Sequence, residues 1–331
     1  MTVSIGLIGC GGISRAHVRG YLAVPDVAAV VAVADIDPAS ARERAAQAGG
    51  ARVFADYRRM LEDGGIDAVD ICLPHHLHAD AVIAAAKAGK HILIEKPLCL
   101  TAAEAEQIAD AVQACGVTLM CAHDQLTLPA VARAKELITS GALGRVYELR
   151  ATDAFFNDFD PATAGWRAHT ATSGGGELID TGYHPTYLLL HLAGSRPAEV
   201  TAMLSNHRLG FMEGEDSARV LVRFEDGAVG EIATSWAYDP APFTGKFSVV
   251  GELGSLWSDG TTLCHRARGE ATTTTEFPHV DTHPAVCADF AARIRDGARP
   301  LHTEREGTDV LEVILAAYRS AAERRTVAVD E

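Results

Sequence analysis

The sequence lacks several features that mark common functional classes. No stretch approaches about 18 uninterrupted apolar residues, so no membrane-spanning helix is expected. No run of lysine and arginine is dense enough to follow a phosphate backbone, and a formal net charge of -15 repels nucleic acid and anionic lipid. The first residues contain neither the basic segment nor the apolar run of a secretory signal. We therefore expect a cytoplasmic protein whose partners include neither nucleic acid nor membranes.

Disulfides and bound metal are also unsupported. The seven cysteines are odd in number, scattered, mostly within apolar runs, and form no C-x-x-C pair. Free, buried thiols are therefore expected. His75, His76 and His78 lie close together, but no further group of candidate ligands accompanies them, so we expect no metal.

The first third of the chain alternates between short apolar runs and helical stretches. The runs at residues 3–8, 27–34, 68–73, 91–94 and 117–121 are expected to be strands. Asp37 and Pro38 begin one helix that stops before Gly49, residues 79–88 form another, and Thr101 with Glu104 is a capping box for a third. This alternation predicts a doubly wound parallel sheet of the Rossmann type, which binds ligands at the carboxyl ends of its strands.

The pattern changes after about residue 123. Helices are expected at 130–140, 178–192, 286–295 and 307–324, and strands at 145–153, 199–206, 218–224, 229–236, 246–251 and 255–258. Consecutive strands, with a hairpin turn at Asp226-Gly227, predict an α+β domain with a large, mainly antiparallel open sheet. At 331 residues, two domains are expected: residues 1–122 for the dinucleotide and 123–331 for substrate and oligomerisation. Packing of the last helices on the first domain is an alternative.

The first strand ends in a glycine-rich turn, Gly9-Cys10-Gly11-Gly12-Ile13-Ser14. The glycines would let the backbone approach a pyrophosphate at the amino end of the following helix. Ser14 stands where the G-x-G-x-x-G pattern has its third glycine, and it is small enough for close helix packing.

Asp35, at the end of the second strand, lies 21 residues after Ser14. Its carboxylate would accept hydrogen bonds from the adenosine ribose and would repel a 2′-phosphate. Because the neighbouring Ile36 supplies no cation, NAD is preferred over NADP as the cofactor.

Nearly the whole chain resembles the Gfo/Idh/MocA family of oxidoreductases, which includes glucose-fructose oxidoreductase and inositol 2-dehydrogenase. The order and spacing of four segments are more specific than any one of them. They are residues 6–17 (GLIGCGGISRAH), the turn from Pro74 to His78, Glu95-Lys96-Pro97, and residues 174–184 (GGGELIDTGYH).

The resemblance implies roles for individual residues. It makes Lys96 the lysine of an E-K-P motif near the nicotinamide and the reacting hydroxyl. It makes Asp180 and His184 a D-x-x-x-H pair at the substrate, with His184 transferring the proton. The residues expected to bind the dinucleotide are Gly9, Gly11, Gly12, Ile13, Asp35, Ile36, Leu73, Pro74, His75, His78, Glu95 and Lys96.

Two positions depart from the family pattern. His75 follows Pro74 where many relatives have asparagine, and Tyr187 stands where many have aspartate three residues after the histidine. Aromatic faces suit the C–H faces of sugar rings, while Arg, Asn and His suit hydroxyls. The candidate substrate contacts are His123, Asn157, Trp166, Arg167, Asp180, His184 and His283.

These residues suit the oxidation of an alcohol. The hydroxyl proton must leave as the carbonyl forms, and an imidazole can accept it near neutral pH. In a helix over 178–192, Asp180 and His184 would lie one turn apart on one face, where a pair of metal ligands is the alternative reading.

We expect an NAD-dependent oxidoreductase that moves a hydride between nicotinamide and a carbinol carbon of a sugar, sugar derivative or cyclitol. The expected assembly is a homodimer or homotetramer formed through the C-terminal sheet. Two alternatives stay open. One is an enzyme that recycles tightly bound NAD through a keto-sugar intermediate, and the other is a non-catalytic NAD-binding regulatory protein.

Overall fold

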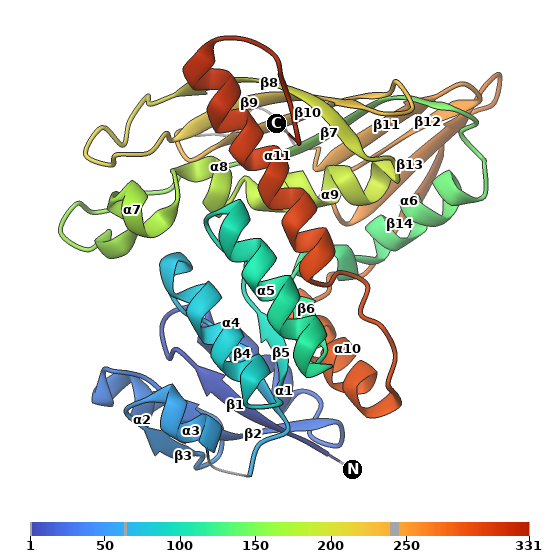
Figure 1. The fold of residues 1–331 in the computed structure, drawn as a ribbon. Coiled ribbons are helices and arrows are strands. Elements are labelled where there is room, and N and C mark those ends of the chain that lie inside the picture. Colours follow the sequence, from blue (N-terminus) through green and yellow to red (C-terminus); the bar gives the residue numbers. More distant parts are fainter. Residues whose placement is uncertain (1, 63–64, 239–244, 331) are drawn as a thin grey trace. The chain divides into compact units, whose positions relative to one another are not determined.

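A computed structural model describes residues 2–62, 65–238 and 245–330 (Figure 1). The chain divides into two compact units. The first contains residues 1–124 and 281–308, and the second contains residues 125–280 and 309–331. Among the described residues, no helix is long and apolar enough to cross a membrane.

The first unit is built on a six-stranded parallel sheet in the order β3-β2-β1-β4-β5-β6. This confirms the predicted doubly wound sheet, although the sequence did not indicate β3. The strands are β1 (Val3–Ile8), β2 (Ala28–Ala34), β3 (Arg52–Phe54), β4 (Ala68–Ile71), β5 (His91–Ile94) and β6 (Leu119–Cys121).

Two helices of this unit begin where the sequence places their caps. The Asp37 side chain accepts hydrogen bonds from the backbone of α2, and Thr101 with Glu104 forms a complete capping box on α5. The helices are α1 (Ser14–Leu22), α2 (Pro38–Gln47), α3 (Tyr57–Glu62), η1 (His75–Leu77), α4 (His78–Lys87), α5 (Ala102–Cys115), η2 (Asp124–Thr127, which extends into the second unit) and α10 (Thr282–Asp296).

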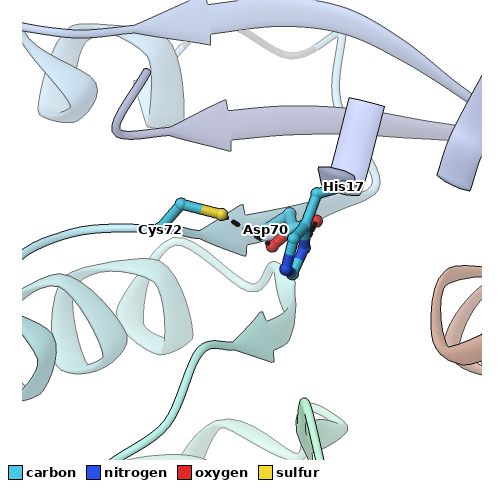
Figure 2. A group of neighbouring side chains, drawn as sticks. All are labelled: His17, Asp70 and Cys72. Carbon is cyan, nitrogen blue, oxygen red and sulfur yellow. Dashed lines mark hydrogen bonds and ion pairs between the residues drawn. The ribbon is translucent and has the colours of Figure 1, made fainter. Parts of the chain in front are cut away.

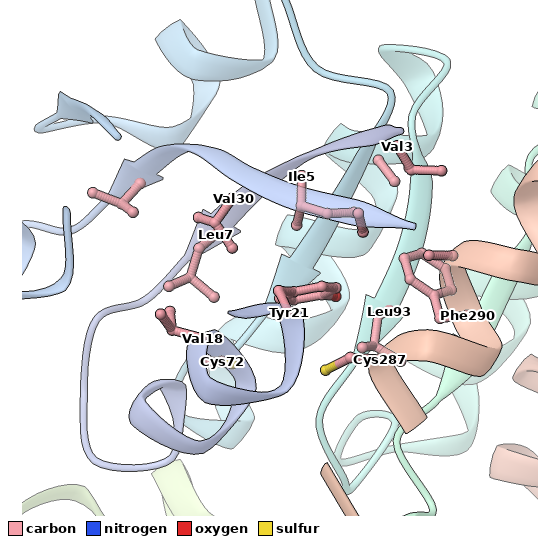
Figure 3. Close-up of a cluster of buried hydrophobic side chains, with 14 of the residues drawn as sticks. Val3, Ile5, Leu7, Val18, Tyr21, Val30, Cys72, Leu93, Cys287 and Phe290 are labelled. Carbon is pink, nitrogen blue, oxygen red and sulfur yellow. The ribbon is translucent and has the colours of Figure 1, made fainter. Parts of the chain in front are cut away.

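Apolar side chains from β1, α1 and α10 form the core of the first unit (Figure 3). Ile5, Leu7, Val18 and Phe290 are fully buried there. The helix α10 packs on α1 at Gly20, where a Cβ atom would lie 2.8 Å from the Cys287 sulfur. A segment from the end of the chain therefore contributes directly to the core beside the glycine turn.

The second unit contains a nine-stranded sheet in the order β14-β13-β12-β11-β7-β10-β9-β8-β15. All neighbouring pairs are antiparallel except β7 with β10, which confirms the mainly antiparallel prediction. The strands are β7 (Val146–Ala154), β8 (Pro197–Ser205), β9 (Ser217–Phe224), β10 (Val229–Ser235), β11 (Phe247–Gly251), β12 (Gly254–Ser258), β13 (Thr262–Ala267), β14 (Thr273–Glu276) and β15 (Val327–Ala328).

The single helix predicted over residues 178–192 is wrong. The chain instead forms a short helix, α8 (Glu177–Asp180), and a longer one, α9 (Tyr183–Ala193). Gly182 lies at the junction, where a Cβ atom would lie 2.7 Å from the Leu178 backbone. The other helices in or reaching this unit are α6 (Pro129–Thr139), η3 (Gly165–Ala168), α7 (Thr170–Ser173) and α11 (Glu304–Glu323).

All seven cysteines are free, but only five of them are buried. Cys115 is exposed and Cys264 is partly exposed, so the expectation of burial is wrong for these two. Cys115 is the last residue of α5. Cys264 lies on β13, the second strand from the sheet edge, and the edge strand beside it, β14, is exposed.

Candidate functional site

The glycine turn after β1 has the geometry of a phosphate cradle. Gly9 has a φ of +91°, and a Cβ atom there would lie 2.4 Å from the Cys72 carbonyl oxygen. Around Gly11 and Gly12 nothing lies within 4 Å of the Cβ position, so their backbone faces open space at the amino end of α1. This turn fits a dinucleotide pyrophosphate, with Ile13 at the helix N-cap.

Ser14 closes the turn by hydrogen bonding. Its hydroxyl donates to the Gly11 carbonyl oxygen at 2.6 Å and accepts from Arg44 Nε at 3.0 Å. Ser14, which stands in place of a third glycine, is thus buried with its hydroxyl fully hydrogen-bonded, and it links α1 to α2.

Asp35 lies beside this turn at the end of β2. One carboxylate oxygen accepts the Cys10 N–H at 2.7 Å, and the other accepts the Asp37 N–H at 2.7 Å. Each oxygen retains a lone pair that a ribose hydroxyl could use. Ile36 is 93% exposed, so its side chain adds no cation to the position that a 2′-phosphate would take.

His78 ties the turns after β4 and β5 together. Its Nδ1 lies 2.7 Å from the Pro97 carbonyl oxygen, and its Nε2 lies 2.8 Å from that of Leu73. Burial lowers the pKa of His78, although the two carbonyls act in the opposite direction. Because both ring nitrogens face protein oxygens, only the ring carbons remain for contact with a dinucleotide.

The neighbouring candidates lie along the same edge. His75 is buried, with its ring centre 5.9 Å from that of His78. Lys96 is partly buried directly after β5, and its backbone N–H donates to the Glu95 carboxylate at 3.2 Å. Leu73 and Pro74 follow β4, so these candidates meet at the carboxyl edge of the parallel sheet.

Three of the substrate candidates form a cluster in the second unit. Arg167 Nε donates to the Asp180 carboxylate at 2.7 Å, and the guanidinium lies 4.2 Å from the centre of the Trp166 ring. Asp180 is 7% exposed. An ion pair against an aromatic face could receive both the hydroxyls and the C–H face of a sugar.

His184 is the second residue of α9, and its Nδ1 lies 2.9 Å from the Tyr187 hydroxyl. That hydroxyl also accepts the Gln125 N–H at 3.1 Å. Tyr187 therefore contacts the proposed proton-transfer residue at the position where the chain departs from the family pattern. Asp180 and His184 lie on separate helices, so the expected single helical face is wrong.

The remaining candidates are dispersed. His123 and His283 belong to the first unit. His123 is buried with its Nδ1 2.7 Å from that of His302, and His283 lies with its ring centre 5.5 Å from that of His17. Asn157, which follows β7 in the second unit, accepts a hydrogen bond from Arg208 through its backbone carbonyl at 2.9 Å.

Glu177, beside Asp180, is a buried acid that the sequence analysis assigned no role. Burial raises the pKa of its carboxyl well above the ordinary range, against the effect of its hydrogen bond with Thr234, and nearby carboxylates raise it further. The Thr234 hydroxyl also contacts the Asp153 carbonyl oxygen at 2.8 Å. One hydroxyl hydrogen cannot fully serve two oxygens, so a proton on Glu177 completes the contact.

Replacing Glu177 by glutamine should change how stability depends on pH. A raised pKa in the folded state stabilises the protein below the ordinary value of 4.5, and this contribution is lost as pH rises through the folded-state pKa. Glutamine stays neutral, so between pH 5 and 8 the free energy of unfolding of E177Q should rise relative to wild type by about 1 kcal/mol or more. Urea unfolding measures this difference. The exposed Glu148→Gln on β7 is the control, and a constant difference between E177Q and wild type would show that Glu177 is already ionised.

The Rossmann sheet, the open glycine turn and the acid after β2 together define a dinucleotide-binding oxidoreductase. Residues 3–123 match an oxidoreductase family with an NAD-binding Rossmann fold, and residues 131–257 match the GFO/IDH/MocA C-terminal domain. The chain belongs to the GFO/IDH/MocA family, whose members include sugar and cyclitol dehydrogenases, and its cofactor is NAD.

Three relatives show how closely the chain follows known members. It is 34% identical to a levoglucosan dehydrogenase of Pseudarthrobacter phenanthrenivorans over 77% of this chain and 73% of that protein. It is 26% identical to a myo-inositol 2-dehydrogenase of Thermotoga maritima over 99% and 98% of the two chains. A solved levoglucosan dehydrogenase in complex with NADH and levoglucosan is 28% identical, with a TM-score of 0.92 over 100% of both chains.

Proposed function

We propose that this protein is an NAD-dependent dehydrogenase that oxidises a carbinol carbon of a sugar, sugar derivative or cyclitol. The observation that carries the substrate class is the cluster of Trp166, Arg167 and Asp180, which joins an aromatic face to a charged pair. The names of the relatives point to the same class, since they act on levoglucosan and myo-inositol.

The chemistry divides between the cofactor and the side chains. When bound, NAD supplies the acceptor for the hydride that leaves the carbinol carbon. His184 takes the hydroxyl proton, so that the C–H and O–H bonds break as the C=O bond forms. Lys96 holds the substrate oxygen through its ammonium group and stabilises its developing negative charge. Asp180 orients a neighbouring substrate hydroxyl, with Arg167 fixing its carboxylate.

Tyr187 sets the tautomer of His184 in this proposal. A neutral imidazole that accepts a proton at Nε2 must already carry a hydrogen on Nδ1. The Tyr187 oxygen, 2.9 Å away, accepts that hydrogen. His184 becomes an imidazolium when it takes the substrate proton. A neutral phenol stabilises this cation less than an aspartate would, so His184 gives up the proton more easily.

The open sheet of the second unit supports a homodimer or homotetramer. Residues paired directly across strands share one face, and the row Leu221, Glu231, Arg150, Ser248 and Trp257 crosses five strands. Leu221 and Trp257 are 49% and 41% exposed on it. Between them lie Ser248 and the Glu231–Arg150 ion pair, so this face combines exposed apolar side chains with paired charges that a second copy could cover. A monomeric mass by light scattering would contradict this assembly.

The proposed activity can be tested by incubating the protein with NAD and a panel of anhydrosugars, inositols and aldoses. Absorbance of free reduced nicotinamide should rise with at least one polyol and should not rise with simple aliphatic alcohols, because these cannot use the Arg167–Asp180 pair. No turnover across the panel would contradict the proposal. Reduced cofactor that stays bound would instead indicate recycling of NAD within each turnover.

A further inference from the structure

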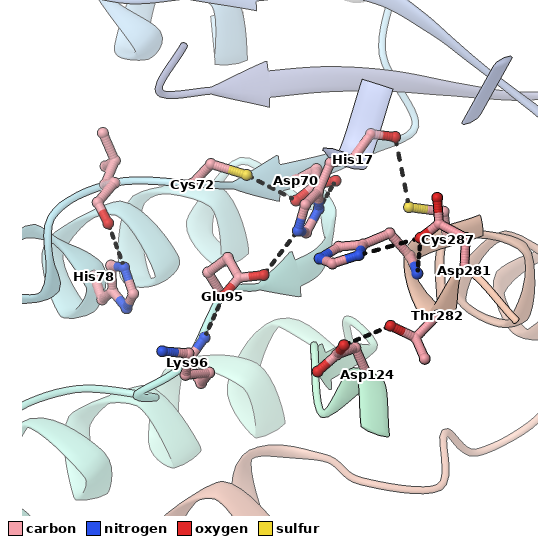
Figure 4. Close-up of polar contacts among 12 residues, drawn as sticks. His17, Asp70, Cys72, His78, Glu95, Lys96, Asp124, Asp281, Thr282 and Cys287 are labelled. Carbon is pink, nitrogen blue, oxygen red and sulfur yellow. Dashed lines mark hydrogen bonds and ion pairs between the residues drawn. The ribbon is translucent and has the colours of Figure 1, made fainter. Parts of the chain in front are cut away.

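A histidine in the first turns of α1 lies completely buried between two carboxylates. His17 Nδ1 is 2.8 Å from Asp70 on β4, and its Nε2 is 2.7 Å from Glu95 after β5. Figures 2 and 4 show the ring pointing at Asp70, and Figure 4 shows its contact with Glu95. Cys72 adds a weak donor, with its sulfur 3.6 Å from the other Asp70 oxygen.

This arrangement determines the charge of the ring. An ionised carboxylate can only accept hydrogen bonds, and a neutral imidazole has only one N–H to donate. Both contacts are therefore satisfied when His17 is an imidazolium. Burial is the largest single effect and opposes that charge, but Asp70 and Cys72 together outweigh it, and the pKa of His17 is raised well above its ordinary value. Burial would likewise raise the pKa of Glu95, yet its hydrogen bond with His17 and the nearby cations hold that pKa at about 2.

Among the described residues, Asp70 and Glu95 are the two carboxylates in hydrogen-bond contact with His17. The thiols of Cys72 and Cys287 stay protonated, because burial raises their pKa far above neutral pH. The titratable groups around this site are Asp70 on β4 and Cys72 directly after it, Glu95 and Lys96 after β5, and His283 and Cys287 on α10; Lys96 acts on Glu95, and Tyr21 on α1 acts on Asp70.

The contacts continue from His17 to the turn that carries Lys96. One Glu95 oxygen is held by His17, and the other accepts the Lys96 backbone N–H at 3.2 Å. Hydrogen bonds thus connect Asp70 on β4, His17 on α1 and Glu95, the residue after β5. The last bond of this series joins Glu95 to the backbone of Lys96. The same α1 begins at the glycine turn, so the helix that faces the pyrophosphate also anchors the turn that carries the lysine.

We propose that His17 is a positioning residue: as a permanent imidazolium it holds Glu95, and through Glu95 it fixes the backbone and the electrostatic field at Lys96. This inference rests on the role of Lys96 in the proposed dehydrogenase. A metal ion bound by His17, Glu95 and His283 would be the alternative, because these residues place possible ligand atoms within 4.8 Å of one another. The two hydrogen bonds from the His17 ring to carboxylates favour a protonated ring over a bound metal ion.

The test compares His17→Gln with a matched substitution of another histidine in the first unit. H17Q loses the charge and one of the two contacts, so kcat/KM for the sugar should fall about tenfold or more, while the Kd for NADH stays within about twofold. His91→Gln is the control, since His91 begins β5, is partly buried and also makes one hydrogen bond, from the Thr118 N–H. Its kcat/KM should stay within about twofold of wild type.

A double-mutant cycle with Glu95→Gln tests the route of the effect. If His17 acts through Glu95, H17Q should cost little more once Glu95 is already glutamine. Additive losses would overturn the proposal. So would equal losses of NADH binding and of activity in H17Q, because these would indicate a general structural role.

Nuclear magnetic resonance of ¹⁵N-histidine-labelled wild type tests the charge without any variant or turnover. Both ring nitrogens of His17 should stay protonated from pH 6 to 9. A neutral ring at pH 7, or a stoichiometric metal whose removal by chelator alters the His17 signals, would overturn the proposal. A protein that turns over no sugar but keeps this imidazolium would contradict the proposed function and leave the charge assignment intact.

Discussion

Replacing His184 by alanine is expected to lower kcat for the sugar by about 10²- to 10⁴-fold, because no other described side chain is assigned to receive the hydroxyl proton. His184 is only partly buried at the start of α9, so its loss should leave the fold and the first unit intact. NADH binding, measured by fluorescence of the reduced nicotinamide, should therefore stay within about twofold of wild type. Steady-state kinetics at several pH values measure the loss.

His207→Ala provides the matched control for this prediction. His207 is an exposed histidine of the same unit, and its contact with Asp216 is made by the backbone rather than by the ring. Its kcat should be unchanged. Full turnover in H184A would remove the proton-transfer role, and a loss confined to KM would assign His184 to substrate binding alone.

The first unit could be predicted closely from the sequence because its signals are local. The parallel strands other than β3 are largely buried on both faces and read as mainly apolar runs, and the caps at Asp37 and Thr101 mark where two of the helices begin. The weakest element, β3, has only three residues with little burial, so its apolar run is too short to stand out. Its pairing with β2 comes from the sheet and not from local pattern.

The break between α8 and α9 could not be read from periodicity. Apolar residues continue at helical spacing from Leu178 to Leu192, and the local signals against one continuous helix are Gly182 and Pro185. The break depends on distant partners: the Trp236 indole donates to the Thr181 hydroxyl at 2.8 Å, and the Glu177 N–H donates to the Glu215 carbonyl at 2.8 Å. Long-range contacts of this kind override the helical pattern.

The network around His17 escaped prediction for a related reason. His17 lies inside the segment that resembles the family, but its partners are 53 and 78 residues away. A buried histidine between two carboxylates has no sequence signature, because each of the three residues alone is compatible with a surface position. Only the parallel order β1-β4-β5 brings α1 against the ends of β4 and β5.

The double variant D35S/I36R is expected to reverse the preference between NAD and NADP. Like-charge repulsion by Asp35 costs several kcal/mol against a 2′-phosphate, and each 1.4 kcal/mol corresponds to about tenfold. Removing the carboxylate and adding a guanidinium at the 93% exposed position 36 should change the ratio of kcat/KM values for the two cofactors by about 100-fold or more. Initial rates with each cofactor at saturating sugar measure this ratio.

The single variant I36R separates the two contributions, because it adds the cation and keeps Asp35. It should change the cofactor ratio less than the double variant does. Asp35 also anchors the glycine turn through the Cys10 N–H at 2.7 Å, a bond that serine can replace only partly. If the double variant loses both cofactors equally with no change in their ratio, Asp35 acts by holding the glycine turn rather than by contacting the ribose. A changed ratio with the turn weakened would show that the same carboxylate performs both tasks.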